Sequence, residues 1–211
     1  MVTRRVKHAL LTGFEPFGNP RPDDNRSWET IRQLAGEQVV AGDTAVICHC
    51  YEIPVSYAPI SEIVPRLHLG EEYSIVIHCG AGVPGAVLIE KLAHRCGYDK
   101  AGNNGEKDVP ADGCVPGYQT ADELHTAVGV EELRDSLRAK GWDKVVVSLD
   151  AGRYLCDYTY YTSLAEAETT YKSRQLAAPK TLFIHVPPMA SDPYSDKELA
   201  EIIRDILRCL A

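Results

Sequence analysis

Long hydrophobic runs are missing from this sequence. No apolar stretch approaches the ~20 residues that a membrane-spanning helix needs. The chain has 45% hydrophobic and 25% charged residues, which are ordinary values for a globular protein. The amino-terminal stretch MVTRRVKHALLTGF has basic residues followed by only a short apolar segment, without the longer apolar region and cleavage site of a secretory signal. We therefore expect neither a membrane protein nor a secreted one.

Positive charge is also in short supply. The chain has 22 Lys and Arg against 30 Asp and Glu, which gives a formal net charge of −8 at pH 7. This surplus of negative charge repels both the phosphates of nucleic acids and the head groups of anionic lipids. We therefore expect no nucleic-acid partner and no membrane-surface partner.

The sequence lacks a regular pattern of paired cysteines. Its seven cysteines are an odd number, and they are scattered through apparent strands and turns. Small secreted domains that rely on disulfides show an even count at regular spacings. The cysteines therefore predict reduced thiols and a cytoplasmic location.

Motifs for metal ions and phosphate groups give no stronger signal. Cys48, His49 and Cys50 alternate on a predicted strand, which puts the two thiols on one face and the imidazole on the other. They do not form the C-x-x-C pair of a structural zinc site. The glycine-rich segment at residues 80–85 lacks the Lys-Ser/Thr of a P-loop, and we interpret it as a turn. We expect no metal and no cofactor.

Short apolar runs alternate along the chain with segments of helical spacing. Strands are predicted at residues 9–12, 44–51, 73–78, 87–92, 145–147 and 181–186. Helices are predicted at residues 25–36, 56–67, 124–140, 155–164 and 196–210, with Pro65 disturbing the end of the second. This alternation predicts a single α/β domain over residues 1–211. Its form is a three-layer α/β/α sandwich around a largely parallel, mixed and twisted sheet.

Two segments rich in glycine interrupt this pattern. Residues 13–18, GFEPFG, predict a fixed loop that holds aromatic rings in a chosen place. Residues 97–117 contain five Gly and two Pro, which predicts a long excursion from the sheet as a short hairpin or a mobile flap.

Cys156 lies about where a predicted strand ends and a predicted helix begins. The run Val145-Val146-Val147 is typical of a buried strand, and Asp150-Ala151-Gly152 can supply a sharp turn before the helix. The unpaired N–H groups and the positive dipole end of a helix favour a thiolate over a thiol. Cys156 is therefore a candidate nucleophile, although its position is also consistent with a buried thiol that fills space behind the helix.

His185 and Glu90 lie at or near the ends of two other predicted strands. Active sites in open α/β sheets gather beyond the carboxyl ends of strands. A thiol, an imidazole and a carboxylate suffice for nucleophilic acyl transfer. On the pattern alone, His185 could equally be a core histidine bonded to a backbone carbonyl, and Glu90 could be a surface carboxylate.

Several sequence blocks resemble the pyroglutamyl-peptidase I family, cysteine peptidases that remove N-terminal pyroglutamate. The blocks are SLDAGRYLCDYTYYTSL, FIHVPP, GFEPFG and LIEKLAH, and the first is similar to the animal-type form. The resemblance implies that Cys156 is the nucleophile, His185 the base and acid, and Glu90 the carboxylate that orients the imidazole. It also implies a cytoplasmic, cofactor-free enzyme with a three-layer α/β/α fold of the phosphorylase/hydrolase-like class.

The same resemblance implies a substrate pocket for small peptides with N-terminal pyroglutamate. Its residues are Phe14, Phe17, Asn25, Tyr154 and Leu155. Pyroglutamate is a neutral lactam, so an apolar pocket with a few hydrogen bonds suits it. Phe14 and Phe17 could also be simple core residues. The family includes monomers and tetramers, so it leaves the oligomeric state open.

One position departs from the family pattern. Bacterial members carry a Gln ten residues before the Glu, and Gly80 stands there in this chain. The contact of that Gln is therefore not transferred.

Arg153 either stabilises a thiolate or pairs with Asp150, and the sequence does not separate these roles. Another Cys-dependent amidase or thioesterase and a catalytically silent binding protein are the alternative functions.

Overall fold

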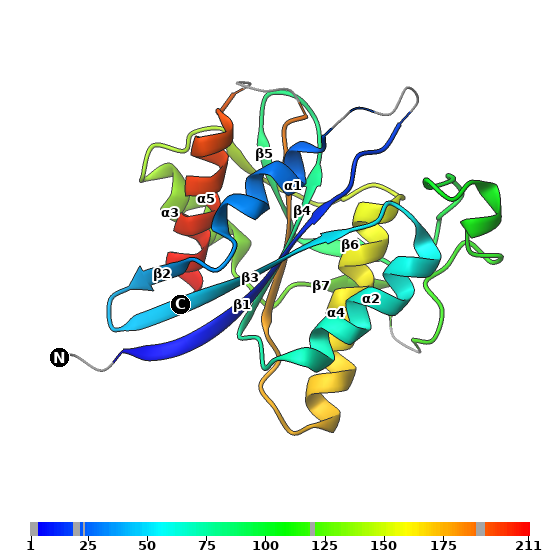
Figure 1. Ribbon diagram of the computed structural model, residues 1–211, viewed down its shortest axis with the longest axis horizontal. Helices are drawn as coiled ribbons and strands as arrows, with labels where there is room; N and C mark the ends of the chain where they lie inside the picture. The colour runs from blue at the N-terminus through cyan, green and yellow to red at the C-terminus, as the bar shows by residue number, and fades with distance from the viewer. Residues whose placement is uncertain (1–3, 19–21, 23, 119–120, 189–192) are drawn as a thin grey trace.

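A computed structural model describes residues 4–18, 22, 24–118, 121–188 and 193–211. Its centre is a seven-stranded sheet with the strand order β2-β3-β1-β4-β9-β5-β8 (Figure 1). These strands are β1 (Arg5–Phe14), β2 (Gln38–Ala41), β3 (Thr44–Ile53), β4 (Ile75–Ala81), β5 (Val87–Glu90), β8 (Val145–Ser148) and β9 (Lys180–Val186). Neighbouring strands in this sheet are parallel except for β2 with β3 and β5 with β9. The predicted mixed, largely parallel sheet is confirmed.

Helices cover both faces of this sheet (Figure 1). One layer consists of α1 (Arg26–Ile31), α3 (Val130–Arg138) and α5 (Asp196–Leu210), and the other of α2 (Tyr57–Gly70) and α4 (Leu155–Ser173). A small antiparallel sheet, β6 (Leu92–His94) with β7 (Glu123–His125), contacts α4. The predicted three-layer sandwich is therefore confirmed.

Strand β9 shows how side-chain alternation separates the two layers. Leu182, Ile184 and Val186 belong to the apolar cluster beneath α1, α3 and α5, whereas Phe183 belongs to the cluster beneath α2 and α4. Because successive side chains of a strand point to opposite faces, His185 lies on the same face as Phe183. The strand therefore directs an imidazole toward the first turn of α4.

Several element boundaries differ from the prediction. The strand expected at residues 87–92 is split, since β5 ends at Glu90 and the chain then turns into β6. The helix expected at residues 124–140 begins only at Val130, because β7 takes its first residues. Pro65 does not end α2, which continues to Gly70. The short edge strand β2 was not predicted. Helix α1 is continued by a 3-10 turn (Arg32–Leu34) in place of a full α-helix to residue 36.

The expectation of seven reduced cysteines is wrong for one pair. Cys96 and Cys114 form a disulfide across a sequence separation of 18 residues. The pairing arises because the glycine-rich segment folds back on itself and brings the two cysteines into an antiparallel bridge. Closing a loop of this length stabilises a fold by about 3 kcal/mol in the chain-entropy model. The remaining cysteines are free, namely Cys48, Cys50, Cys79, Cys156 and Cys209.

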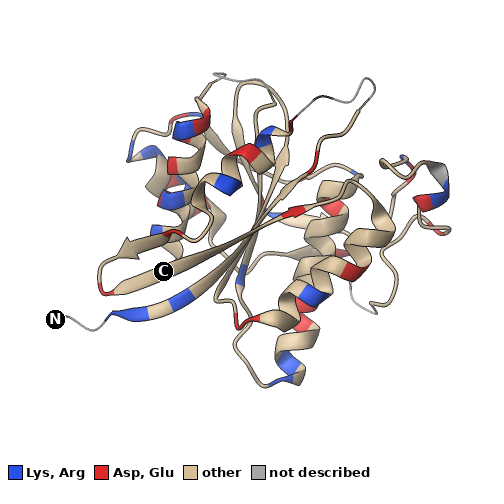
Figure 2. Ribbon diagram, in the orientation of Figure 1, with Lys and Arg blue, Asp and Glu red and all other residues tan. Residues whose placement is uncertain are grey.

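Charged residues of both signs lie mostly on the helices and connecting segments (Figure 2). The inner strands supply the apolar core, with Leu11, Ile77 and Ile184 completely buried. Among the described helices, none combines the length and the apolar character needed to cross a bilayer.

We expect Gly13→Ala to lower the free energy of unfolding by about 2–3 kcal/mol. Strand β1 passes so close to α1 that a Cβ atom at Gly13 would lie 2.5 Å from the Cα of Trp28 and 2.8 Å from the carbonyl oxygen of Ser27. Both neighbours are backbone atoms and cannot simply rotate away. The change is measured by urea unfolding.

Gly70→Ala is the matched control, because a Cβ atom at that position would meet no atom within 4 Å beyond its chain neighbours and the adjacent backbone of its own helix. Gly70 closes α2, so alanine there is expected to raise the free energy of unfolding by about 0.5 kcal/mol. Equal unfolding midpoints for the two variants would contradict the packing argument.

Candidate active site

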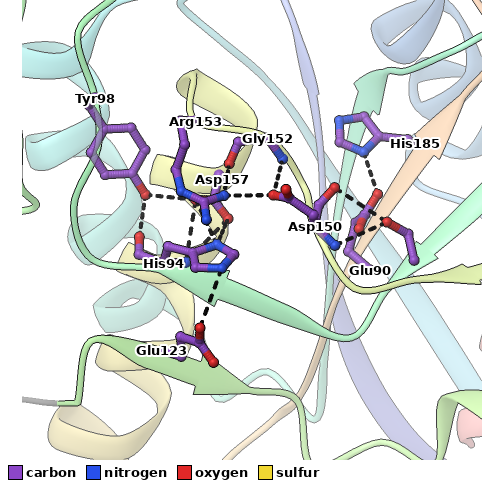
Figure 3. A network of polar contacts seen from close by, with 10 residues as sticks. Glu90, His94, Tyr98, Glu123, Asp150, Gly152, Arg153, Asp157 and His185 are labelled. Carbon is purple, nitrogen blue, oxygen red and sulfur yellow. Dashed lines mark hydrogen bonds and ion pairs between the residues drawn. The ribbon is translucent and has the colours of Figure 1, made fainter.

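A buried imidazole and a buried carboxylate meet between two strands. The Nδ1 atom of His185 lies 2.8 Å from the Oε1 atom of Glu90 (Figure 3), and the two residues are 6% and 0% exposed. The antiparallel pairing of β5 with β9 brings them together, since it sets Leu88 opposite His185. The hydroxyl of Tyr160 donates to the backbone carbonyl of Glu90 at 3.0 Å. This contact fixes Glu90 from the α4 side.

Cys156 faces this pair from the first turn of α4. Burial is the largest single influence on His185 and lowers its pKa, whereas the negative charge of the Cys156 sulfur and its hydrogen bond raise it. With the hydrogen bond to Glu90, they raise the pKa of His185 to about 10. The imidazole therefore remains protonated at neutral pH.

Two glycines of the β4 strand and the turn after it make room for these groups. A Cβ atom at Gly80 would lie 2.9 Å from the Sγ atom of Cys156 and 2.8 Å from the ring of Phe183. A Cβ atom at Gly82 would lie 2.7 Å from the Cβ atom of His185. The sulfur and the imidazole thus occupy space that only glycine leaves open.

The three ionisable groups were expected at or near the carboxyl ends of strands, and Glu90 and His185 do lie at or next to the ends of β5 and β9. Strands β5 and β8 run antiparallel to β9. Glu90 therefore reaches His185 across an antiparallel pair, and residues 149–154 carry the chain from the end of β8 to the start of α4. The sequence analysis placed the three residues at or near strand ends, but it assigned no direction to the individual strands of the mixed sheet.

All five residues predicted for the substrate pocket line one narrow cavity next to Cys156. It is lined by Phe14, Phe17, Asn25, Val55, Ala81, Tyr154, Leu155 and Cys156. Phe14 and Leu155 are almost completely buried, whereas Phe17 is 38% exposed. The rings of Phe17 and Tyr154 lie 6.2 Å apart between centroids.

Asn25 has a structural task in addition to its place in this wall. It is the N-cap of α1, and its Oδ1 atom accepts from the backbone N–H of Ser27 at 3.0 Å. Its Nδ2 atom donates to the carbonyl of Glu15 at 3.0 Å. Both ends of the amide are therefore used to join the aromatic loop to α1.

Val55 and Ala81 were not predicted as pocket residues. Gly80 leaves space for the sulfur of Cys156 and does not line the pocket. Ala81, one position later, does line it. The position where the bacterial pattern has Gln is therefore not the one that faces the pocket here. Nothing in the local sequence marks Val55, since it reaches the wall through the turn after β3.

A larger cleft adjoins the narrow pocket. It measures about 340 Å³ and shares Phe17, Asn25 and Ala81 with the pocket. Its other walls are Pro22, Asp24, Arg26, Glu29, Pro188 and Asp196. A group bound next to Cys156 therefore has a path into a cavity of the size that small ligands and peptide segments occupy.

A second polar network contacts the first turn of α4 (Figure 3). Asp157 is completely buried and accepts from the backbone N–H of His94 at 3.2 Å and from the hydroxyl of Tyr98 at 3.1 Å. Burial raises the pKa of Asp157 to about 6 against the opposing influence of His94 and Arg153. The Nη1 atom of Arg153 lies 2.6 Å from the Oδ1 atom of Asp150, so the structure favours the pairing of this arginine with Asp150.

Metal ligands do not cluster in the part of the chain that the structure describes. No three His, Cys, Asp or Glu side chains there gather closely enough to hold a metal ion.

The fold matches that of a known peptidase structure. Pyroglutamyl peptidase I from Bacillus amyloliquefaciens superposes with a TM-score of 0.81 over 96% of this chain and 95% of that one, at 18% sequence identity. The α/β sandwich described above is therefore the fold found in that enzyme.

Sequence comparison identifies the family. A family model described as pyroglutamyl peptidase matches residues 7–201. Pyroglutamyl-peptidase 1 of Homo sapiens is 34% identical over 205 residues, which cover 95% of this chain and 88% of the relative. Pyrrolidone-carboxylate peptidase of Thermococcus kodakarensis is 31% identical over 181 residues, covering 85% and 80%. The chain belongs to the pyroglutamyl peptidase family of cysteine peptidases.

Cys156→Ala is expected to lower the pKa of His185 from about 10, because the charge and the hydrogen bond of the sulfur are its main raising influences. Imidazole NMR signals recorded across a pH titration measure the change. An unchanged pKa would contradict the contact between the two side chains.

The raised pKa of His185 also has a consequence for stability. The folded state holds its proton more tightly than the unfolded state, in which histidine titrates near pH ~6.5. The stabilisation is therefore fully present below about pH 6.5 and is lost as the pH rises toward about 10. Urea unfolding of the wild type should show this decline, and Cys156→Ala should weaken it.

Gly80→Ala is expected to slow the alkylation of Cys156 by iodoacetamide about tenfold at pH 7. The added methyl group would displace the sulfur from its hydrogen bond with His185. Mass spectrometry of labelled peptides gives the rate, and the exposed Cys209 serves as the internal control. Equal labelling of Cys156 in both proteins would show that Gly80 does not seat the sulfur.

Proposed function

We propose that this protein hydrolyses the amide bond that follows an N-terminal pyroglutamyl residue of a peptide. Cys156 acts as the nucleophile, His185 as the general base and acid, and Glu90 as the carboxylate that orients the imidazole. The observation that carries the proposal is the meeting of these groups, with the 2.8 Å hydrogen bond between His185 and Glu90 and the hydrogen bond of His185 to Cys156. They open on a pocket whose described lining residues include no Asp, Glu, Lys or Arg.

The reaction proceeds through a thioester. The Sγ atom of Cys156 attacks the pyroglutamyl carbonyl carbon, and the first-turn N–H groups of α4 offer donors to the oxyanion that forms. His185 gives its proton to the leaving nitrogen, the C–N bond breaks, and the shortened peptide departs as an amine. Water then attacks the thioester while His185 takes its proton, which releases pyroglutamate and restores the sulfur.

The pocket favours a lactam over an ordinary amino terminus. The described residues that line it include neither Asp nor Glu, so an α-ammonium group would be desolvated there with no carboxylate to pair with it. A neutral five-membered ring can instead pack against Phe14, Phe17 and Leu155. The rest of the peptide extends into the adjoining cleft of about 340 Å³.

The relatives support the same reaction. Pyroglutamyl-peptidase 1 of Homo sapiens and pyrrolidone-carboxylate peptidase of Thermococcus kodakarensis carry the activity in their names. Because the family model spans residues 7–201, we propose that the whole chain acts as one catalytic unit.

The wild-type protein is expected to release the fluorophore from a pyroglutamyl amide. Cys156→Ala should reduce the rate by more than about 10³-fold, because the thioester cannot form. Cys209→Ala is the matched control, since it removes an exposed thiol that does not line the pocket. Retained activity in Cys156→Ala would rule out this nucleophile, and faster turnover of prolyl or alanyl amides would point to a different amidase.

A further inference from the structure

The disulfide loop, residues 96–114, contacts the backs of two walls of the substrate pocket. The hydroxyl of Tyr154 donates to the carbonyl of Ala101 at 3.0 Å. The Nδ2 atom of Asn103 donates to the Oε1 atom of Glu15 at 2.8 Å and to the carbonyl of Pro16 at 3.1 Å. Glu15 and Pro16 connect the two phenylalanines of the pocket, so one loop holds both aromatic walls.

A third wall is held by the same residue. The backbone N–H of Asn103 donates to the carbonyl of Val55 at 2.7 Å, and the N–H of Val55 donates to the Oε1 atom of Glu15 at 3.1 Å. The approach is close, because a Cβ atom at Gly102 would lie 2.5 Å from the carbonyl oxygen of Val55. Asn103, Glu15 and Val55 are therefore joined to one another by a closed ring of three hydrogen bonds beside the pocket wall.

The disulfide loop is itself anchored at several points. The Asp108 carboxylate accepts from the backbone N–H groups of Tyr57 at 2.6 Å and Ala58 at 2.9 Å, at the start of α2. The hydroxyl of Tyr57 donates to the carbonyl of Lys100 at 3.0 Å. At the base of the loop, the disulfide joins Cys96 to Cys114. Asn103 therefore lies in a segment whose two ends are held in place by these contacts.

We propose that Asn103 is a positioning residue that sets the width of the pyroglutamyl pocket, and that the Cys96–Cys114 disulfide keeps Asn103 in place. The inference rests on the proposed function. Asn103 contacts the walls and none of the three reacting groups, so its loss changes the binding of the ring and leaves the chemical step intact. Opening the disulfide has the same effect.

The redox step is a simple exchange. A dithiol reductant such as dithiothreitol breaks the S–S bond, each of the two cysteine sulfurs gains a proton, and the reductant becomes a cyclic disulfide. We therefore expect the oxidised enzyme to have a lower KM for a pyroglutamyl substrate than the reduced enzyme.

The first test is the steady-state kinetics of Asn103→Ala with a pyroglutamyl amide. KM is expected to rise about fivefold, in line with the loss of exposed hydrogen bonds, while kcat stays within about twofold. Asn104→Ala is the matched control, because this exposed neighbour lies in the same loop. An unchanged KM in Asn103→Ala, or an equal fall in kcat, overturns the positioning role.

A charge exchange separates positioning from general loop damage. Asn103→Asp places a second carboxylate against Glu15, so KM should rise more than in Asn103→Ala. Adding Glu15→Gln places an amide donor opposite the new carboxylate and should lower KM part of the way back to the wild-type value. Failure of this rescue would contradict the direct contact between the two side chains.

The disulfide is tested with the double variant Cys96→Ser/Cys114→Ser. Its KM should be raised about fivefold and should no longer respond to dithiothreitol, whereas dithiothreitol should raise the KM of the wild type. Adding Asn103→Ala to this variant should raise KM no further, because both changes release the same contact. Two results overturn the role of the disulfide: effects of the cysteine and Asn103 substitutions on KM that are fully additive, or a wild-type KM that dithiothreitol does not change.

Dithiothreitol could also act on the thiol of Cys156 itself. The alkylation rate of Cys156, measured in each sample, distinguishes such an effect from the opening of the disulfide loop. Turnover by the wild type with no KM change in the variants overturns this inference alone. Absence of turnover by the wild type overturns the proposed function and this inference with it.

Discussion

The contact between His185 and Glu90 is the constraint on which the site depends. Glu90 is completely buried, and among the described residues its Oε2 atom has no hydrogen-bond partner. A lone carboxylate in such a place is costly, and removing one member of a buried ion pair typically costs about 3–5 kcal/mol. The imidazolium at 2.8 Å makes this burial tolerable. The antiparallel pairing of β5 with β9 brings the two groups together, and Gly82 leaves room for His185, whereas Gly80 leaves room for the sulfur of Cys156.

Much of the fold could be predicted because its signals are local. Apolar runs identified the central strands, and the helical spacing of apolar side chains identified α5. Strand direction has no such local signal. Nothing within residues 87–90 or 145–148 indicates that these strands run against β9, since direction is decided by the path of the connecting segments.

The same distinction applies to the candidate site. Cys156, His185 and Glu90 stand in sequence blocks that resemble a family, so they could be found without knowing how the strands pair. The Cys96–Cys114 bridge could not, because its formation depends on a fold-back of the intervening glycine-rich segment. Val55 and Ala81 were missed for a related reason, because a small apolar residue in a pocket wall is indistinguishable in sequence from a core residue.

The position of β9 has a consequence for synthesis of the chain. This strand lies between β4 and β5 in the sheet, yet it comes after both of them and after β8 in the sequence. Until it emerges from the ribosome, β4 and β5 present unpaired edges, which are prone to associate with other strands. The thiol and the carboxylate are made before the imidazole. A nascent chain therefore holds an incomplete candidate site until β9 is translated.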